Sequence, residues 1–244
     1  MRWTPGDRGN IEDRRGSSAR MGAMPLRIGG ILLLLVLSWF TGVDFLSLAG
    51  DIPQSQVEST GTSGPIETTP EEERIVDMVD AVMADSQSTW TSLMGGRYQP
   101  TTAVLFRDAT NSNCGFAQSA VGPFYCPADR KVYLDLSFFN ELQSRFGAPG
   151  EFAQAYVLAH EVGHHLQTLM GTEAEVRQLQ QSNPGARNEL SVRMELQADC
   201  YAGVWGRSAA QSGGRVDLDP GDLEDGLRAA AAIGDDTLQK RSGG

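Results

Sequence analysis

Apolar and polar residues alternate along the second half of the chain with two different periods. Between Glu71 and Leu93 the apolar residues recur every three or four positions, which predicts a helix. The run 101–107 looks like a strand, and apolar and polar residues alternate over 131–136, which predicts a second strand. Further helices are predicted over 151–170, from a Thr172–Glu175 capping box to about residue 182, over 188–208, and from Asp219 onward. Long helices with a small sheet indicate an α+β fold.

The longest apolar stretch precedes these elements. From Ile28 to Val43 every residue is uncharged, and apolar residues continue after Asp44. A membrane-spanning helix needs about 20 mainly apolar residues, so residues 28–50 are predicted to form one transmembrane helix. Six arginines and only three acids precede it, whereas acidic residues follow it. By the positive-inside rule, residues 1–27 are expected to be an Arg-rich cytoplasmic tail, and the bulk of the chain to be extracytoplasmic at the cell membrane.

Two other interpretations of this stretch stay open. Ser47-Leu48-Ala49 resembles the small-x-small site of a cleaved signal peptide, and a buried core helix is the third possibility. Residues 51–70 are rich in Ser, Thr, Gly, Pro and Gln without apolar periodicity, which is typical of a flexible linker. The folded domain is therefore expected to occupy residues 71–244.

Composition and charge narrow the class of protein. The formal net charge is −11, with 40% hydrophobic and 21% charged residues. Such proportions are ordinary for a globular protein and exclude a wholly disordered chain. An acidic chain argues against a nucleic acid partner, because phosphates are bound by basic surfaces. Three cysteines are too few for an all-cysteine zinc site or for a disulfide-rich scaffold.

Candidate chemistry lies at the end of the apolar run 152–159, where the chain reads His160-Glu161-Val162-Gly163-His164. Two histidines four positions apart share one face of a helix. Both imidazoles can therefore bind one zinc ion, while Glu161 can reach a water on that ion. All three histidines of the chain, His165 included, fall in this stretch, and burying them without a partner is costly. The alternative is a group of capped or solvent-facing structural histidines.

Zinc needs a third protein ligand. The HExxHxxGxxH continuation is excluded, because Gln167 and Met170 stand where it needs a glycine and a histidine. Glu195 and Asp199, four positions apart, instead resemble the gluzincin pattern, in which the Glu binds zinc and the Asp hydrogen-bonds the first histidine. Glu195 is thus the predicted third ligand and Asp199 the predicted partner of His160. A solvated helix face is the alternative.

Four separated stretches, 114–139, 146–167, 195–205 and 229–240, resemble the neutral zinc metallopeptidase family of bacteria, as do the Arg-rich start and the hydrophobic segment. The resemblance implies a single-pass membrane protein with a zincin-like α+β domain, an HExxH active-site helix and one bound Zn²⁺. It also implies a peptide or protein substrate. A zinc-activated water would hydrolyse its peptide bonds, with Glu161 as general base.

Members of that family usually continue with a segment bearing a His, an Arg and a final Cys, whereas this sequence stops at Gly244. Oxyanion stabilisation would then fall to Tyr201 or Arg207. A zinc-binding envelope protein with a zincin fold but no turnover is therefore kept as the alternative function, with a metal-free interaction domain as a third.

The cysteines are relevant to whether the domain lies in an oxidising compartment. Export would allow Cys114 and Cys126, which flank a loop containing Gly and Pro, to form a disulfide. Two unpaired buried thiols are the alternative. Cys200 is expected to be packed and free.

Overall fold

The computed structural model describes residues 1–17, 66–119, 122–139, 150–211, 213–219, 221, 222, 224, 226 and 227. All of these belong to one folded unit. Among them, no helix is long and apolar enough to cross a membrane. The predicted membrane segment 28–50 lies outside the described residues, as do most of the predicted linker and most of the helix predicted from Asp219.

Two of the predicted helices form with nearly the expected bounds. Helix α3 (Pro70–Met94) begins at Thr69, whose side chain accepts a hydrogen bond of 3.1 Å from the backbone N–H of Glu72. Proline at the first position and three glutamates in the first turn further favour this start. Helix α5 (Glu151–Met170) ends at Gly171, which adopts the left-handed conformation with φ of 80°.

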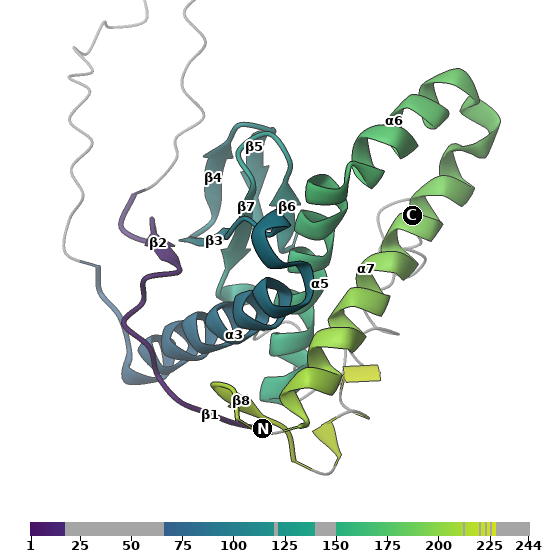
Figure 1. Cartoon of the computed structure of the whole chain (residues 1–244). Helices are drawn as coiled ribbons and strands as arrows, with labels where there is room; N and C mark the ends of the chain where they lie inside the picture. The colour runs from purple at the N-terminus through teal and green to yellow at the C-terminus, as the bar shows by residue number, and fades with distance from the viewer. Residues whose placement is uncertain are drawn as a thin grey trace, which may run out of the picture. The chain divides into compact units, whose positions relative to one another are not determined.

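The helical hairpin that follows begins differently from expectation. Helix α6 (Thr172–Ser182) starts without a side-chain cap, and Gly171 takes the N-cap position. Because Gly171 both ends α5 and starts α6, Thr172 is already helical and the expected capping box does not form. After the 3-10 turn η3 (Pro184–Ala186), helix α7 (Arg187–Ala209) runs back along the molecule. In Figure 1, α6 and the first half of α7 extend away from the sheet as a pair.

The main sheet has four strands in the order β2-β3-β7-β6. The first three strands are parallel, and β6 is antiparallel to β7. Two small antiparallel pairs accompany it, β4 with β5 and β1 with β8. The bounds are Arg2–Trp3 for β1, Ile11–Asp13 for β2, Thr102–Phe106 for β3, Ala109–Ser112 for β4, Gly115–Gln118 for β5, Phe124–Cys126 for β6, Lys131–Asp135 for β7 and Val216–Asp217 for β8; the 3-10 turn η1 is Gly95–Arg97. The two strands predicted from the sequence are β3 and β7, and both are confirmed.

The hydrophobic core surrounds α5. This helix contacts α3, the strands β6 and β7, and α7, as Figure 1 shows. Fully buried side chains come from each of these layers, among them Val79, Leu134, Leu158, Leu166 and Trp205. Each buried aliphatic side chain contributes about 1.5–3 kcal/mol relative to an exposed one. The helix that carries the HExxH motif is therefore held on several sides.

The N-terminal residues depart most from expectation, because residues 1–17 belong to this same folded unit. Strand β2 pairs in parallel register with β3, Ile11 opposite Ala103, and β1 pairs with β8. We expected a separate tail up to residue 27 and a domain starting at residue 71, whereas residues 1–17 share a folded unit with the residues from 66 onward. A strand of three residues with one apolar side chain carries no periodic signal by which the sequence could reveal it.

The N-terminal arginines bind the start of helix α3. The side chain of Arg15 is 2% exposed and forms ion pairs with Asp13, Glu72 and Glu73 at 2.6–3.0 Å. The guanidinium of Arg8 pairs with Glu73 and Asp77. Burial works against the charge of Arg15, yet its hydrogen bonds to these carboxylates raise its pKa further above the usual range. These arginines are structural ion-pair partners within the domain.

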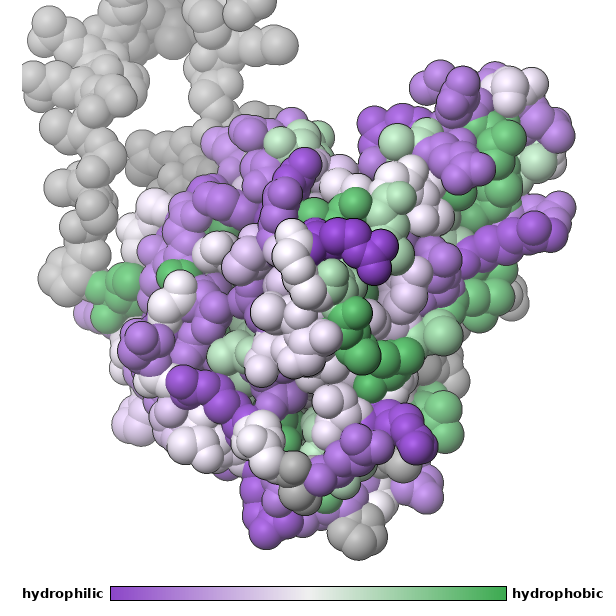
Figure 2. All heavy atoms as spheres, viewed as in Figure 1, coloured by the Kyte–Doolittle hydropathy of each residue, from purple (hydrophilic) through white to green (hydrophobic). Residues whose placement is uncertain are grey.

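The surface is mostly hydrophilic on the face shown in Figure 2, with smaller hydrophobic areas near α6 and α7. Three of the exposed apolar side chains of these two helices are Leu179, Val192 and Leu196, which is 61% exposed. They lie beside charged residues such as Arg193, which pairs with Glu189.

Candidate metal site

Two helices bring three potential metal ligands together. His160 and His164 lie on α5, and Glu195 lies on α7. The Oε2 atom of Glu195 is 3.1 Å from His160 Nε2 and 3.5 Å from His164 Nε2. Ligand atoms on a tetrahedral zinc ion are roughly 3.3–3.5 Å apart, as follows from bond lengths of about 2.0–2.2 Å. One atom from each residue lies within 4.8 Å of the others, so two imidazoles and a carboxylate fit one zinc ion.

The close crossing of the two helices depends on Gly163. A Cβ atom at this position would lie 2.9 Å from both the Cα and the carbonyl oxygen of Ala198. Real Cβ atoms do not approach backbone atoms this closely, so a glycine is needed here. The contact lies between the two histidines on α5 and between Glu195 and Asp199 on α7. It therefore sets the separation across which Glu195 reaches both rings.

His160 is oriented by a carboxylate, as the sequence predicted for Asp199. The Nδ1 atom of His160 donates to Asp199 Oδ1 at 2.8 Å. The hydroxyl of Tyr156 donates to the same oxygen. A histidine that donates from Nδ1 to a carboxylate turns Nε2 toward a metal ion and becomes a better ligand. The structure thus brings Asp199 to the position that this role requires.

His164 is oriented by Gln167, which sequence reasoning missed. The Nδ1 atom of His164 lies 2.8 Å from Gln167 Oε1. In the sequence Gln167 served only to exclude a different ligand pattern. A signal was nonetheless present, since a polar residue three positions after a histidine lies on the same helix face, here within an apolar run.

The charges at the site are strongly coupled. Burial alone would lower the pKa of His160, but its hydrogen bonds to Asp199 and Glu195 outweigh that effect and raise the pKa to about 10. Burial would raise the pKa of Glu195, but hydrogen bonds from His160 and His164 lower it to about 2. For His164 too, burial is outweighed by the bond to Glu195, and its pKa is raised. His160 thus holds its proton against the carboxylate that would share a metal ion with it, and the pKa of His164 shifts in the same direction.

Glu161 is a buried residue of α5 that follows His160 directly in the HExxH motif. Its side chain is 8% exposed, and its charge helps to raise the pKa of both His160 and His164, so it lies close to both rings. Glu161 lies outside the ligand set, and its role as general base stays a prediction from the HExxH motif.

His165 takes no part in the ligand cluster. Its side chain is fully buried, donates from Nε2 to the carbonyl oxygen of Gln99 at 2.6 Å and contacts the Tyr125 hydroxyl through Nδ1 at 3.0 Å. Burial lowers the pKa of this ring, which is consistent with a neutral imidazole. It connects α5 with β6 and with the segment before β3.

The two candidates for oxyanion stabilisation lie elsewhere. The ring of Tyr201 packs edge-on against Trp90, with centroids 5.6 Å apart, and its hydroxyl lies 3.9 Å from the sulfur of Met170. Arg207 is exposed in the last turn of α7, about 18 Å along the helix from Glu195 at 1.5 Å per residue. The contacts of Tyr201 and the distance of Arg207 do not favour either role.

The cysteines pair as expected. Cys114 and Cys126 form a disulfide with a Cα–Cα distance of 5.8 Å, and Cys200 is free and exposed. The disulfide joins the turn of the β4–β5 hairpin to β6. Since β6 is the edge strand of the main sheet and contacts α5, this bond steadies an edge near the HExxH helix. We expected Cys200 to be packed, and its exposure corrects that part.

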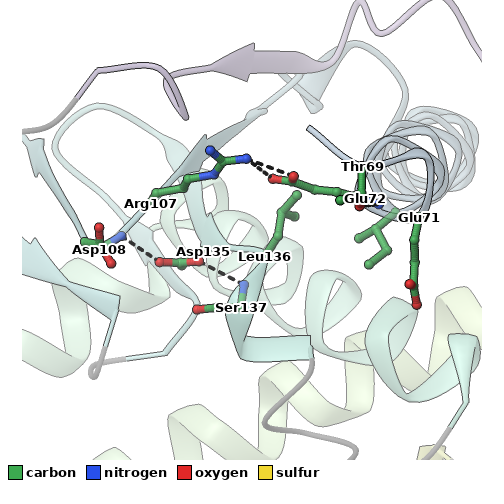
Figure 3. A pocket seen from close by; sticks show the side chains of 9 residues that line it. Thr69, Glu71, Glu72, Arg107, Asp108, Asp135, Leu136 and Ser137 are labelled. Carbon is green, nitrogen blue, oxygen red and sulfur yellow. Dashed lines mark hydrogen bonds and ion pairs between the residues drawn. The ribbon is translucent and has the colours of Figure 1, made fainter. Parts of the chain in front are cut away.

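A separate pocket of about 360 Å³ lies where β3 and β7 end, beside the start of α3. In Figure 3, Arg107 binds Glu72, and Asp135 accepts from the backbone N–H groups of Asp108 and Ser137. Several of its polar groups are thus bound by the protein itself, and we assign no ligand to it.

A histidine pair on one helix, completed by a glutamate from a later helix, defines the ligand set of a mononuclear zinc hydrolase. A family model described as "Putative neutral zinc metallopeptidase" matches residues 1–244, and the chain belongs to this family.

Relatives in two bacterial groups share much of the sequence. Identity to "Uncharacterized protein YpfJ" of Escherichia coli (strain K12) is 47% over 257 residues, which cover 100% of this chain and 87% of the relative. Identity to "Uncharacterized protein Rv2575" of Mycobacterium tuberculosis (strain H37Rv) is 44% over 165 residues, 64% of this chain and 55% of the relative. No solved structure matches the chain.

Proposed function

We propose that this chain is a zinc-dependent metallopeptidase that hydrolyses peptide bonds in a peptide or protein substrate. The observation that carries the proposal is the cluster of His160, His164 and Glu195, whose ligand atoms have the spacing of a zinc site. The family name supports zinc and peptide-bond hydrolysis. The three ligands would hold one Zn²⁺, which when bound supplies Lewis acidity and lowers the pKa of a water toward about 7.

Residues around the three ligands would transfer the proton, orient a ligand and bind the substrate. Glu161 accepts a proton from the attacking water and delivers it to the leaving amine. Asp199 holds His160 by its Nδ1–H. Among the residues that the structure describes, no strand pairs with the outer edge of β6, which contacts α5, so an extended peptide can add there as a further strand.

The test separates metal binding from turnover. In Glu161→Gln the ligand set is intact, so we expect one zinc per chain, as in the wild type, but a loss of at least about 100-fold in the cleavage rate of a fluorogenic peptide library. The matched control is Glu189→Gln, which makes the same change at a residue 66% exposed on the far part of α7, and it should cleave at the wild-type rate.

Each outcome has a clear meaning. Wild-type activity in Glu161→Gln would show that another group is the general base. Wild-type protein with one tightly bound zinc and no cleavage of any peptide would support the alternative, a zinc-binding protein without turnover.

A further inference from the structure

Gln167 lies one turn after His164 on α5, with its side chain fully buried against α7. Its amide makes three contacts. The oxygen Oε1 lies 2.8 Å from His164 Nδ1, and Nε2 donates to the backbone carbonyl of Met194 at 2.7 Å and to Gln197 Oε1 at 3.0 Å. The contacts to Met194 and Gln197 cross to α7 on either side of Glu195.

The backbone of α7 fixes which way this amide points. The carbonyl oxygen of Met194 can only accept a hydrogen bond, so the Nε2 end of Gln167 must face it. The Oε1 end then faces His164, and because it too can only accept, His164 must donate from Nδ1. In the neutral ring this leaves the lone pair on Nε2, the atom that lies 3.5 Å from Glu195.

We propose that Gln167 is a positioning residue that sets the tautomer and orientation of His164 for metal binding. The inference rests on the proposed zinc site and adds the means by which its second histidine is held. Asp199 does this for His160 with a charge, whereas Gln167 does it for His164 with a neutral amide. Since the same amide binds the residue before Glu195, it also couples ligands on two helices.

The first variant is Gln167→Met in the full chain, which keeps the length and volume of the side chain but removes all three hydrogen bonds. We expect zinc affinity, measured by competition with a chelator, to fall about 10- to 100-fold. The matched control is Gln154→Met, the same change two turns before the motif on the same helix, which should leave zinc affinity unchanged.

A second variant separates orientation from simple packing. Gln167→Glu keeps an oxygen acceptor for His164 but loses the N–H donors to α7, so its zinc affinity should lie between those of the wild type and Gln167→Met. In ¹⁵N NMR of the zinc-loaded protein, the Nδ1–H of His164 should be protected from exchange in the wild type and in Gln167→Glu, and exposed to exchange in Gln167→Met.

The inference is overturned if Gln167→Met retains both wild-type zinc affinity and the protected Nδ1–H signal. A wild-type protein that binds no zinc would instead overturn the proposed function. In that case the hydrogen bonds are still tested by the side-chain amide protons of Gln167, which should exchange slowly in the metal-free protein. Rapid exchange of these amide protons would show that Gln167 does not form the proposed hydrogen bonds.

Discussion

At the scale of single residues, the candidate metal ligands could be predicted from sequence motifs, whereas some of their hydrogen-bond partners are known only from the packing of the helices. The i, i+4 spacing of His160 and His164 follows from helix geometry, and Glu195 was predicted because Glu195 and Asp199 resemble the gluzincin pattern. The spacing of Gln167 from His164 placed both on one helix face, but the contact of Gln167 with the carbonyl of Met194 forms only once the two helices have packed. At this scale, the Nδ1 hydrogen bonds of His160 to Asp199 and of His164 to Gln167 orient the two rings so that each Nε2 faces Glu195.

The raised pKa of His160 predicts a pH dependence of metal binding. With a pKa of about 10 in the metal-free protein, the ring keeps its Nε2 proton at neutral pH, and zinc must displace it. Apparent zinc affinity should therefore rise about tenfold per pH unit between pH 7 and 9 for each proton displaced. Calorimetry in buffers of different ionisation enthalpy counts the released protons. Release of no proton at pH 7 would contradict this account.

The stability of the metal-free protein should change with pH in the direction opposite to zinc affinity. Because the folded-state pKa of His160 is raised above its usual value, its contribution to the stability of the metal-free protein is present at pH 6 and lost as the pH rises toward 10. Asp199→Asn, which removes a group that raises this pKa, should flatten both dependences.

At the scale of elements, helices were predicted more accurately than the strands. Helices α3, α5 and α7 follow from apolar periodicity over 20 residues or more, and their bounds differ from expectation by at most one residue. Strands β4 and β5 lie in a polar hairpin, and β2 has three residues. Such short strands owe their conformation to their partners, so the sequence alone could not specify them.

The crossing of α5 and α7 predicts opposite effects for two glycine substitutions. In Gly163→Ala the new Cβ would overlap the Ala198 backbone, so we expect a loss of about 1–3 kcal/mol in unfolding free energy and weaker zinc binding. In Gly203→Ala, also within a helix, the new Cβ has no neighbour within 4 Å, and alanine should stabilise α7 by up to about 1 kcal/mol.

Urea unfolding of the metal-free proteins and chelator competition provide the two measurements for this pair. If Gly163→Ala were as stable as Gly203→Ala and bound zinc as the wild type does, the close approach of the helices would not be what places Glu195.

At the scale of the whole molecule, the packing of the N-terminal residues bears on which side of a membrane they and the domain can lie. Strand β2 is hydrogen-bonded to β3, and Arg15 is buried among glutamates of α3. Strands that pair in this way cannot lie on opposite sides of a hydrocarbon core about 30 Å thick. The charge pattern around residues 28–50 predicted a cytoplasmic N-terminus and an extracytoplasmic domain, and this localisation stays a prediction. In the structure, residues 1–17 and the domain belong to one folded unit. The positive-inside rule uses only the charges that flank an apolar segment, so it takes no account of a tertiary contact such as the pairing of β2 with β3.

We therefore predict that residues 1–17 and the helices of the metal site lie on the same side of any membrane the protein meets. In a Cys200→Ser background, a single cysteine at the exposed Thr4 and one at the exposed Ser88 should react alike with a membrane-impermeant maleimide in cells expressing the protein. Both react before permeabilisation if the domain is outside, and neither does if it is inside. The Cys200→Ser parent gives the background. Labelling of one reporter without the other would mean that the membrane separates the N-terminal strands from the domain, and that the pairing of β2 with β3 does not exist there.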